Sequence, residues 1–169
     1  MMNRTLQIGL VGLLVLVGMG CVDPSDRRPG LRLSGEVVGV PIDDWSFSDQ
    51  YQEIFLESQT WYRIPHSVTT VCAARAEKLY VPTIYFEGGQ WPDKFWNSNV
   101  DANPLVRLKI GDQIYEREAV VLQDPAEALL AFQALADKYP FWQDLLSKPA
   151  SERPDMALLR MDPRSTNAE

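Results

Sequence analysis

The chain has 169 residues, of which 46% are hydrophobic and 23% charged, a balance typical of one folded domain and not of a disordered chain. Its formal net charge is −7 at pH 7. Nucleic acid binding requires a basic surface, so this charge argues against nucleic acid as a partner. It also argues against a protein that is held to an anionic membrane by charge alone.

The first residues have the layout of a secretory leader. An apolar run over residues 6–19 follows a single basic residue, Arg4, and is shorter than the roughly 20 apolar residues that a membrane span needs. The run ends at Gly20 and Cys21, which resembles the lipobox of bacterial lipoproteins, although Gly18 stands where that pattern usually has Leu. The resemblance implies lipidation of Cys21. An ordinary leader or an uncleaved anchor is the alternative.

The lipoprotein resemblance also divides the chain. The expected parts are a signal peptide (1–20), a lipid-anchored tether (21–30), a folded domain (31–162) and a frayed tail (163–169). Removing the signal peptide takes away one of the 16 basic residues and none of the 23 acidic ones, which leaves a charge of −8.

The same resemblance implies a location and bears on the two cysteines, which could form a disulfide only if Cys21 is not lipidated. A lipid anchor places the domain on the periplasmic side of the cell envelope. An acidic residue after the anchor cysteine would resemble an inner-membrane retention signal. Val22 stands there instead, which favours the outer membrane. Lipidation of Cys21 leaves Cys72 as the one remaining thiol, which we expect to be a small buried hydrophobic residue.

Strand patterns follow one another in the first half of the domain. Alternating or β-branched residues predict strands over 31–40, 51–58, 66–75 and 78–86. Only two residues separate the last two strands, which is hairpin spacing. A stronger hairpin signal is Gly111-Asp112, which lies between predicted strands 104–110 and 113–122. Five or six strands with short connections favour an antiparallel sheet or barrel over βαβ units.

Helical signals come after these strands. Asp124 is a favourable N-cap, Pro125 fits the first helical position, and Glu127 stands where a capping box would place it. A helix over 124–139 then brings its apolar residues onto one face. The remaining predicted elements are a short helical turn over 141–147 and a returning last strand over 155–161.

The sequence carries no pattern of a metal or hydrolytic site. It has one histidine, His66, and no clustered metal-ligand spacing. No G-x-S-x-G motif is present, and Cys72 would lie about 20 Å from His66 along a straight strand. Walker and dinucleotide glycine motifs are missing as well. We therefore expect no catalytic cluster of side chains.

Residues 60–139 hold the most informative pattern, carried by "LYVPT", "DKFWNSN", "ANPLVRLKIGD" and "YEREAVVL". The order is strand hairpin, loop, short helix, Asn-Pro, strand, tight turn, long strand and helix. It resembles the split β-barrel superfamily of flavin-binding proteins, which includes pyridoxamine-phosphate oxidases and deazaflavin-dependent nitroreductase-like proteins. The resemblance implies a mainly β (α+β) fold, a split antiparallel β-barrel with a C-terminal helix and short connecting helices.

The resemblance further implies a flavin groove at a homodimer interface. The residues that stand at the family's cofactor positions are His66, Thr69, Thr70, Thr83, Lys94, Trp96 and Asn97. Lys94 resembles the phosphate-binding lysine, with Thr83 as the hydroxyl before it. The strand that starts at His66 usually supplies a basic residue and backbone contacts to the flavin ring. An arginine is the expected residue at that place, and the candidates to replace it are Arg63 and Arg75.

Each of these residues also has an ordinary structural explanation. Lys94 fits a solvated loop, and Trp96 fits a core or interface anchor. Asn97 and Asn99 fit caps of the short helix or of the turn that follows it. The flavin interpretation therefore depends on whether these side chains meet at one place.

Two functions follow from this pattern. The first is a membrane-anchored periplasmic homodimer that binds FMN or a deazaflavin. As an enzyme, it would be an oxidoreductase whose cofactor carries out electron or hydride transfer on a small molecule. The second is a cofactor-free lipoprotein that keeps the fold as a binding or interaction module, with its aromatic residues on a partner surface. A yellow or a colourless purified protein distinguishes the two.

Overall fold

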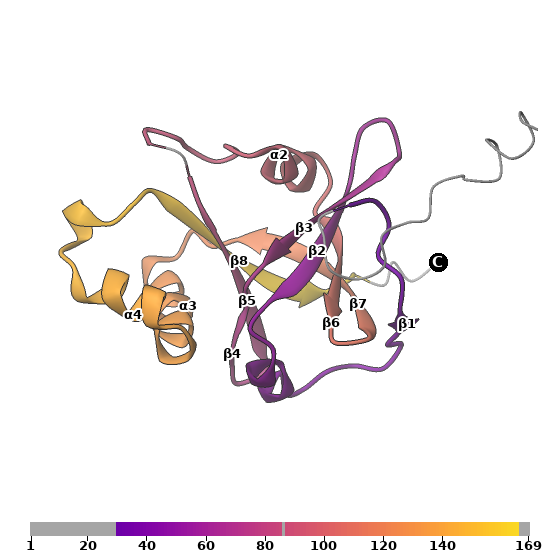
Figure 1. Ribbon diagram of the computed structural model, residues 1–169, viewed down its shortest axis with the longest axis horizontal. Helices are drawn as coiled ribbons and strands as arrows, with labels where there is room; N and C mark the ends of the chain where they lie inside the picture. Colours follow the sequence, from indigo (N-terminus) through magenta and orange to yellow (C-terminus); the bar gives the residue numbers. More distant parts are fainter. Residues whose placement is uncertain (1–29, 86, 166–169) are drawn as a thin grey trace, which may run out of the picture.

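A curled sheet of eight strands dominates the computed structural model, which describes residues 30–85 and 87–165 (Figure 1). The strands are β1 (Glu36–Val37), β2 (Ile54–Gln59), β3 (Pro65–Thr70), β4 (Ala73–Arg75), β5 (Lys78–Ile84), β6 (Leu105–Ile110), β7 (Gln113–Val121) and β8 (Met156–Pro163). Their order is β3-β2-β6-β7-β8-β5-β4, with antiparallel pairing throughout, while β1 joins β7 in parallel.

Short helices complete the domain. They are η1 (Ser46–Gln50), α2 (Phe95–Ala102), α3 (Pro125–Lys138), α4 (Pro140–Ser147) and η2 (Ala150–Glu152). Within the described ranges, no helix is both long and apolar enough to cross a membrane. The predicted signal peptide and Cys21 lie outside the described residues.

Both predicted hairpins are confirmed. β6 and β7 pair across Gly111, whose φ of 61° is a backbone conformation that glycine adopts without strain. β4 and β5 pair across a turn in which Ala76 takes a φ of 53°. The predicted helices over 124–139 and 141–147 and the last strand are present as α3, α4 and β8.

Two predicted strands differ from the structure. The strand predicted over 66–75 is divided into β3 and β4, because the carbonyl of Cys72 accepts hydrogen bonds from α3 instead of from a strand. The strand predicted over 31–40 shrinks to β1. In this segment the N–H of Leu33 donates to the Glu57 carboxylate, and the carbonyl of Leu33 accepts from Arg107. Hydrogen bonds to side chains therefore take the place of strand pairing.

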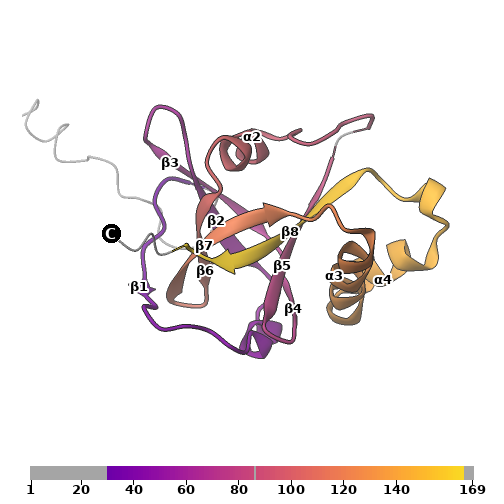
Figure 2. The same cartoon turned by 180° about the vertical axis from the view of Figure 1, so that it is seen from behind.

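The sheet has an apolar layer on each face. The inner layer fills the curl of the sheet with side chains that include Trp45, Leu56, Leu108 and Leu159. The outer layer lies between the sheet and the helices α3 and α4 and includes Phe132, Leu135 and Trp142. Seen from behind, α3 and α4 lie together at one side of the sheet, away from α2 (Figure 2). α2 instead contacts β2 and β3 (Figure 1).

Polar contacts hold α3 in place at both ends. The Asp124 carboxylate accepts a hydrogen bond from the N–H of Ala126 and so caps the first turn, as predicted. Glu127 does not complete a capping box, because its carboxylate binds Lys78 and Arg160 on the sheet. At the other end, the Lys138 ammonium donates to the carbonyls of Ser48 and Cys72. The helix is thereby fixed to strands β5 and β8 and to the segment that joins β3 to β4.

Candidate functional site

The start of α2 brings three of the predicted residues together. Lys94 is the N-cap, Asn97 lies in the first turn, and Thr83 comes from the end of β5. The Asn97 side-chain oxygen accepts hydrogen bonds from the Lys94 N–H at 3.0 Å and from the Thr83 hydroxyl at 3.4 Å. Thr83, Lys94 and Asn97 are called the α2 cluster below.

The α2 cluster has the character of an anion site. Asn97 is fully buried, and its side-chain NH₂ has no hydrogen-bond partner among the described residues. A lysine side chain has no acceptor, so Lys94 does not cap the first amides of the helix, and the first turn contains no acidic residue. A helix N-terminus carries partial positive charge, to which Lys94 adds a full one. A buried unpaired amide beside positive charge favours a bound anion.

His66 lies beside the same helix. Its ring packs edge-on against that of Phe95, the first residue of α2, with 5.0 Å between the ring centroids. Burial lowers the pKa of His66, so the imidazole is neutral at pH 7. Its Nδ1 is buried and has no partner in the described part of the chain. His66 therefore approaches the α2 cluster as a neutral hydrogen-bonding group.

The other predicted residues do not join this cluster. Successive residues of a strand point to opposite faces, so Thr69 and Thr70 of β3 cannot both face one ligand. Trp96 is only 7% exposed and packs in the inner apolar layer, so it presents no ring for stacking. Asn99 donates a hydrogen bond to the Ser58 hydroxyl and so fastens α2 to β2.

The two arginines proposed as substitutes lie at different places in the sheet. Arg63 is in the turn between β2 and β3, where its φ is 64°. Arg75 ends β4, which stands at the opposite end of the strand order from β3.

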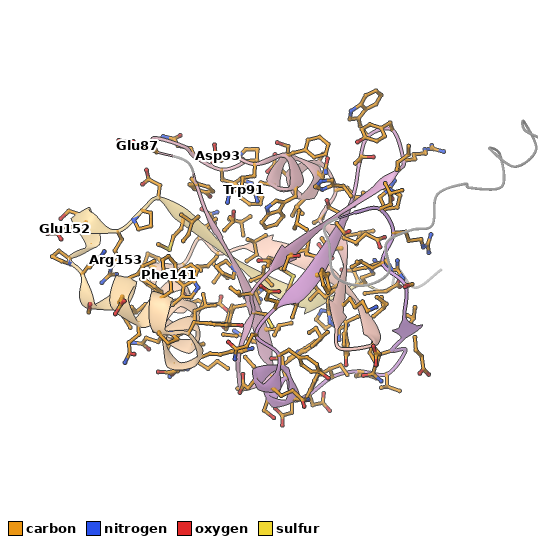
Figure 3. The ribbon with its side chains drawn as sticks, in the orientation of Figure 1. Glu87, Trp91, Asp93, Phe141, Glu152 and Arg153 are labelled. Atoms are coloured by element: carbon orange, nitrogen blue, oxygen red, sulfur yellow. The ribbon has the colours of Figure 1, made fainter. Side chains whose placement is uncertain are left out.

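A cleft that the sequence did not reveal lies between two projecting segments. Figure 3 shows them: one carries Glu87, Trp91 and Asp93, and the other carries Phe141, Glu152 and Arg153. The cleft has a volume of about 640 Å³ and is lined mainly by apolar and aromatic side chains, among them Tyr85, Trp91, Leu129, Phe132, Met156 and Leu158. This volume is typical of small-molecule sites.

The cleft borders the α2 cluster through shared elements. The Trp91 indole N–H donates to the carboxylate of Asp101 in α2 at 2.8 Å. Ala157, which lines the cleft, pairs with Thr83 in the sheet. On the far wall the Arg153 guanidinium lies over the Phe132 ring, 5.1 Å from its centroid. The residues that line the cleft come from separate parts of the sequence, so no local pattern predicted it.

A second, polar cavity of about 450 Å³ lies where the C-terminal end of β8 pairs with the middle of β7. Its arginines are Arg117, which lies 4.9 Å over the Trp45 ring, and Arg160, which is paired with Asp162. Burial lowers the pKa of Arg117. None of the predicted cofactor residues lines this cavity or the cleft. The described residues contain no group of three His, Cys, Asp or Glu side chains that could hold a metal ion.

Comparison with known proteins bears on the fold. No protein-family model matches the sequence, and no curated protein matches it. Solved structures do match. One, from Listeria innocua, is provisionally named a pyridoxamine 5′-phosphate oxidase, with 15% identity and a TM-score of 0.52 over 70% of this chain and 89% of that chain. Another is the heme storage protein HutZ from Vibrio cholerae, with 15% identity and a TM-score of 0.51 over 69% of this chain and 85% of that chain.

A third similar structure is described as a domain-swapped dimer, with 18% identity and a TM-score of 0.51 over 66% of this chain and 81% of that chain. The structural neighbours are split-barrel proteins of the pyridoxamine-phosphate oxidase type. The predicted fold class, a mainly β (α+β) split antiparallel barrel, is thereby confirmed. At these identities the likeness concerns the fold.

Proposed function

We propose that this split-barrel chain binds FMN or a related flavin at the α2 cluster, as a homodimer anchored to a membrane on the periplasmic side of the cell envelope. The observation that carries the proposal is the buried, unpartnered NH₂ of Asn97 at a helix N-terminus where Lys94 holds the N-cap position without capping the first amides. The similarity of the fold to that of a structure named for pyridoxamine 5′-phosphate oxidase supports a flavin-related role. The lipid anchor and the periplasmic location rest on residues 6–21 of the sequence.

The residues at the α2 cluster fit the phosphate of such a cofactor. Lys94 supplies an ammonium group, the first turn of α2 supplies backbone N–H groups, and Thr83 supplies a hydroxyl. The ammonium group and the backbone N–H groups are donors, as a phosphate dianion requires, whereas the Thr83 hydroxyl would first have to turn away from the Asn97 oxygen to which it donates. Charge-assisted hydrogen bonds are stronger than neutral ones. The domain as a whole is acidic, so these local contacts must hold the phosphate without a general attractive field.

The chemistry of this site is that of the cofactor. A bound flavin supplies electron or hydride transfer, and the chain supplies binding and orientation. The neutral His66 lies at the edge of the α2 cluster, where it can donate or accept one hydrogen bond. Trp96, buried beneath, fixes the position of α2 instead of contacting a ligand.

Titration of the purified mature chain with FMN, followed by flavin fluorescence, tests the proposal. Loss of one partner from a partly buried charge pair costs about 2 kcal/mol or more, so Lys94→Ala should weaken FMN binding about thirtyfold. Lys148→Ala, a change at an exposed lysine that follows α4, serves as the matched control and should bind as the wild type does. If both variants bind alike, the phosphate lies elsewhere and Arg63, His66 and Arg75 become the residues to change.

Two observations favour the second candidate, a cofactor-free binding module. The Asn97 oxygen is already used by two donors within the chain, and neither large cavity is lined by the predicted cofactor residues. The hydrophobic cleft would then be the binding surface. A colourless wild-type protein that does not bind FMN in the titration would establish this alternative over the flavin proposal.

A further inference from the structure

The turn between β2 and β3 presents the most exposed aromatic surface of the described residues. Trp61 is 87% exposed, Ile64 is 51% exposed and Tyr62 is 44% exposed. The rings of Trp61 and Tyr62 pack edge to face, 5.2 Å apart. Residues 61–64 are called the hairpin tip below. Large apolar side chains that gather on a surface mark a place of interaction.

Hydrogen bonds fix the conformation of the hairpin tip. The N–H of Arg63 donates to the carbonyl of Thr60 at 3.0 Å, and the Thr60 hydroxyl donates to the carbonyl of Ile64. The paired strands β2 and β3 carry the turn beyond the rest of the sheet (Figure 1). The apolar side chains are therefore presented together on a fixed support, away from the inner core.

The charge around the hairpin tip differs from that of the chain as a whole. Residues 58–70 contain no Asp or Glu, and Arg63 is exposed. Residues 27–35 contain three arginines and no acidic residue, and of these arginines Arg32 is exposed in the structure. In a chain of net charge −7, this region combines exposed apolar side chains with positive charge. That combination suits an anionic phospholipid surface.

The N-terminal segment joins the domain on the same edge strand. The backbones of Gly30 and Ser67 of β3 exchange two hydrogen bonds, at 2.8 and 3.1 Å. Ser67 is three residues from Ile64, about 10 Å along the strand. A chain from Cys21 to Gly30 spans at most about 30 Å. A membrane anchor within residues 6–21 therefore keeps the hairpin tip within reach of the bilayer.

We propose that the hairpin tip contacts the phospholipid surface of the membrane to which the chain is anchored. Trp61 and Tyr62 place their amphipathic rings at the headgroup level, and Ile64 enters the boundary with the acyl chains. Arg63 and Arg32 meet anionic headgroups, each worth about fivefold in surface affinity. The contact turns α3 and α4, at the far side of the molecule, toward water (Figure 1). This inference rests on the proposed membrane anchor and is independent of the flavin proposal.

Tryptophan fluorescence of the full chain tests the contact directly. Three of the five tryptophans are buried, Trp91 is half-buried, and Trp61 is the exposed one. The chain is purified from membranes and reconstituted into vesicles of phosphatidylethanolamine and phosphatidylglycerol, with plain or brominated acyl chains. The difference in emission between the wild type and Trp61→Phe is the emission of Trp61. We expect brominated lipid to quench most of that emission and to leave the emission of the variant unchanged.

The matched control moves the exposed tryptophan to the far side of the molecule. Phe141 of α4 is 56% exposed, and Phe141→Trp in the Trp61→Phe background should escape quenching. Replacing phosphatidylglycerol by phosphatidylcholine should reduce the quenching of Trp61 several-fold.

Four results would overturn the proposal. They are an unquenched Trp61, equal quenching at positions 61 and 141, recovery of the chain in the aqueous fraction, and conversion of a dimer in detergent to a monomer by Trp61→Ser. The last result would assign the hairpin tip to an interface between two copies of the chain.

Discussion

At the scale of single residues, Ala76 is held in a conformation that a side chain disfavours. It is exposed, and its φ of 53° allows β4 to turn directly into β5. In the left-handed backbone region an L-residue is about 1 kcal/mol less stable than glycine. Ala76→Gly should therefore raise the free energy of unfolding by about 0.5–1 kcal/mol, measured by urea titration. Ala126→Gly, in the first turn of α3, should lower it, and a loss of stability in both variants would contradict the argument.

At the scale of secondary-structure elements, Glu127 joins α3 to the sheet. Its carboxylate binds Lys78 of β5 at 2.8 Å and Arg160 of β8 at 2.8 Å, and these hydrogen bonds, that of Lys78 first, hold its pKa below the ordinary value of 4.5. A depressed pKa contributes stability that is present above pH 4.5 and is lost as the pH falls through the lower, folded-state value. The side chain of Lys78 is 43% exposed, so solvent screening reduces what this pair contributes to stability.

Glu127→Gln tests this contact between α3 and the sheet. Hydrogen bonds to charged groups are worth about 1.5–3 kcal/mol, and partial exposure places the expected loss at pH 7 near about 1–2 kcal/mol. The difference from wild type should shrink as the pH falls below 4.5, because the unfolded state takes up a proton there, and it should vanish once the pH passes the lower, folded-state pKa. Glu152→Gln, at an exposed carboxylate of η2 (Figure 3), should change neither the stability at pH 7 nor its dependence on pH. A difference that does not depend on pH would show that Glu127 acts by packing and not by charge.

At the scale of the whole molecule, the flavin proposal requires a second copy of the chain. Phe95, 50% exposed beside Lys94 and His66, is the apolar side chain that a partner is expected to cover. Light scattering should give twice the monomer mass for the mature chain. Phe95→Ser should lower both dimer stability and FMN affinity, whereas Phe141→Ser should change neither. A wild-type monomer that still binds FMN would remove the shared groove from the proposal.

The elements that the sequence determined by itself are those with local causes. The Gly111-Asp112 turn between two alternating runs predicted β6 and β7, and Asp124-Pro125 before a helical apolar period predicted α3. The order of these elements, together with a few side chains, resembles the split β-barrel superfamily, and the fold that this resemblance implied is confirmed. It also predicted that Thr83, Lys94 and Asn97 meet, because α2 follows β5 closely and folds back over its end.

Tertiary structure decided what depends on partners that are distant in the sequence. The strand predicted over 66–75 is interrupted because Lys138 and Tyr139, more than sixty residues away, bind the carbonyl of Cys72. Glu127 has the spacing of a capping box, yet two cations on neighbouring strands offer its carboxylate stronger hydrogen bonds than its own helix does. Tertiary packing also decides that Trp96 is buried and that Trp61 is exposed. A sequence pattern states which side chains are apolar, and only the packing of the sheet against α2 determines which of them are covered.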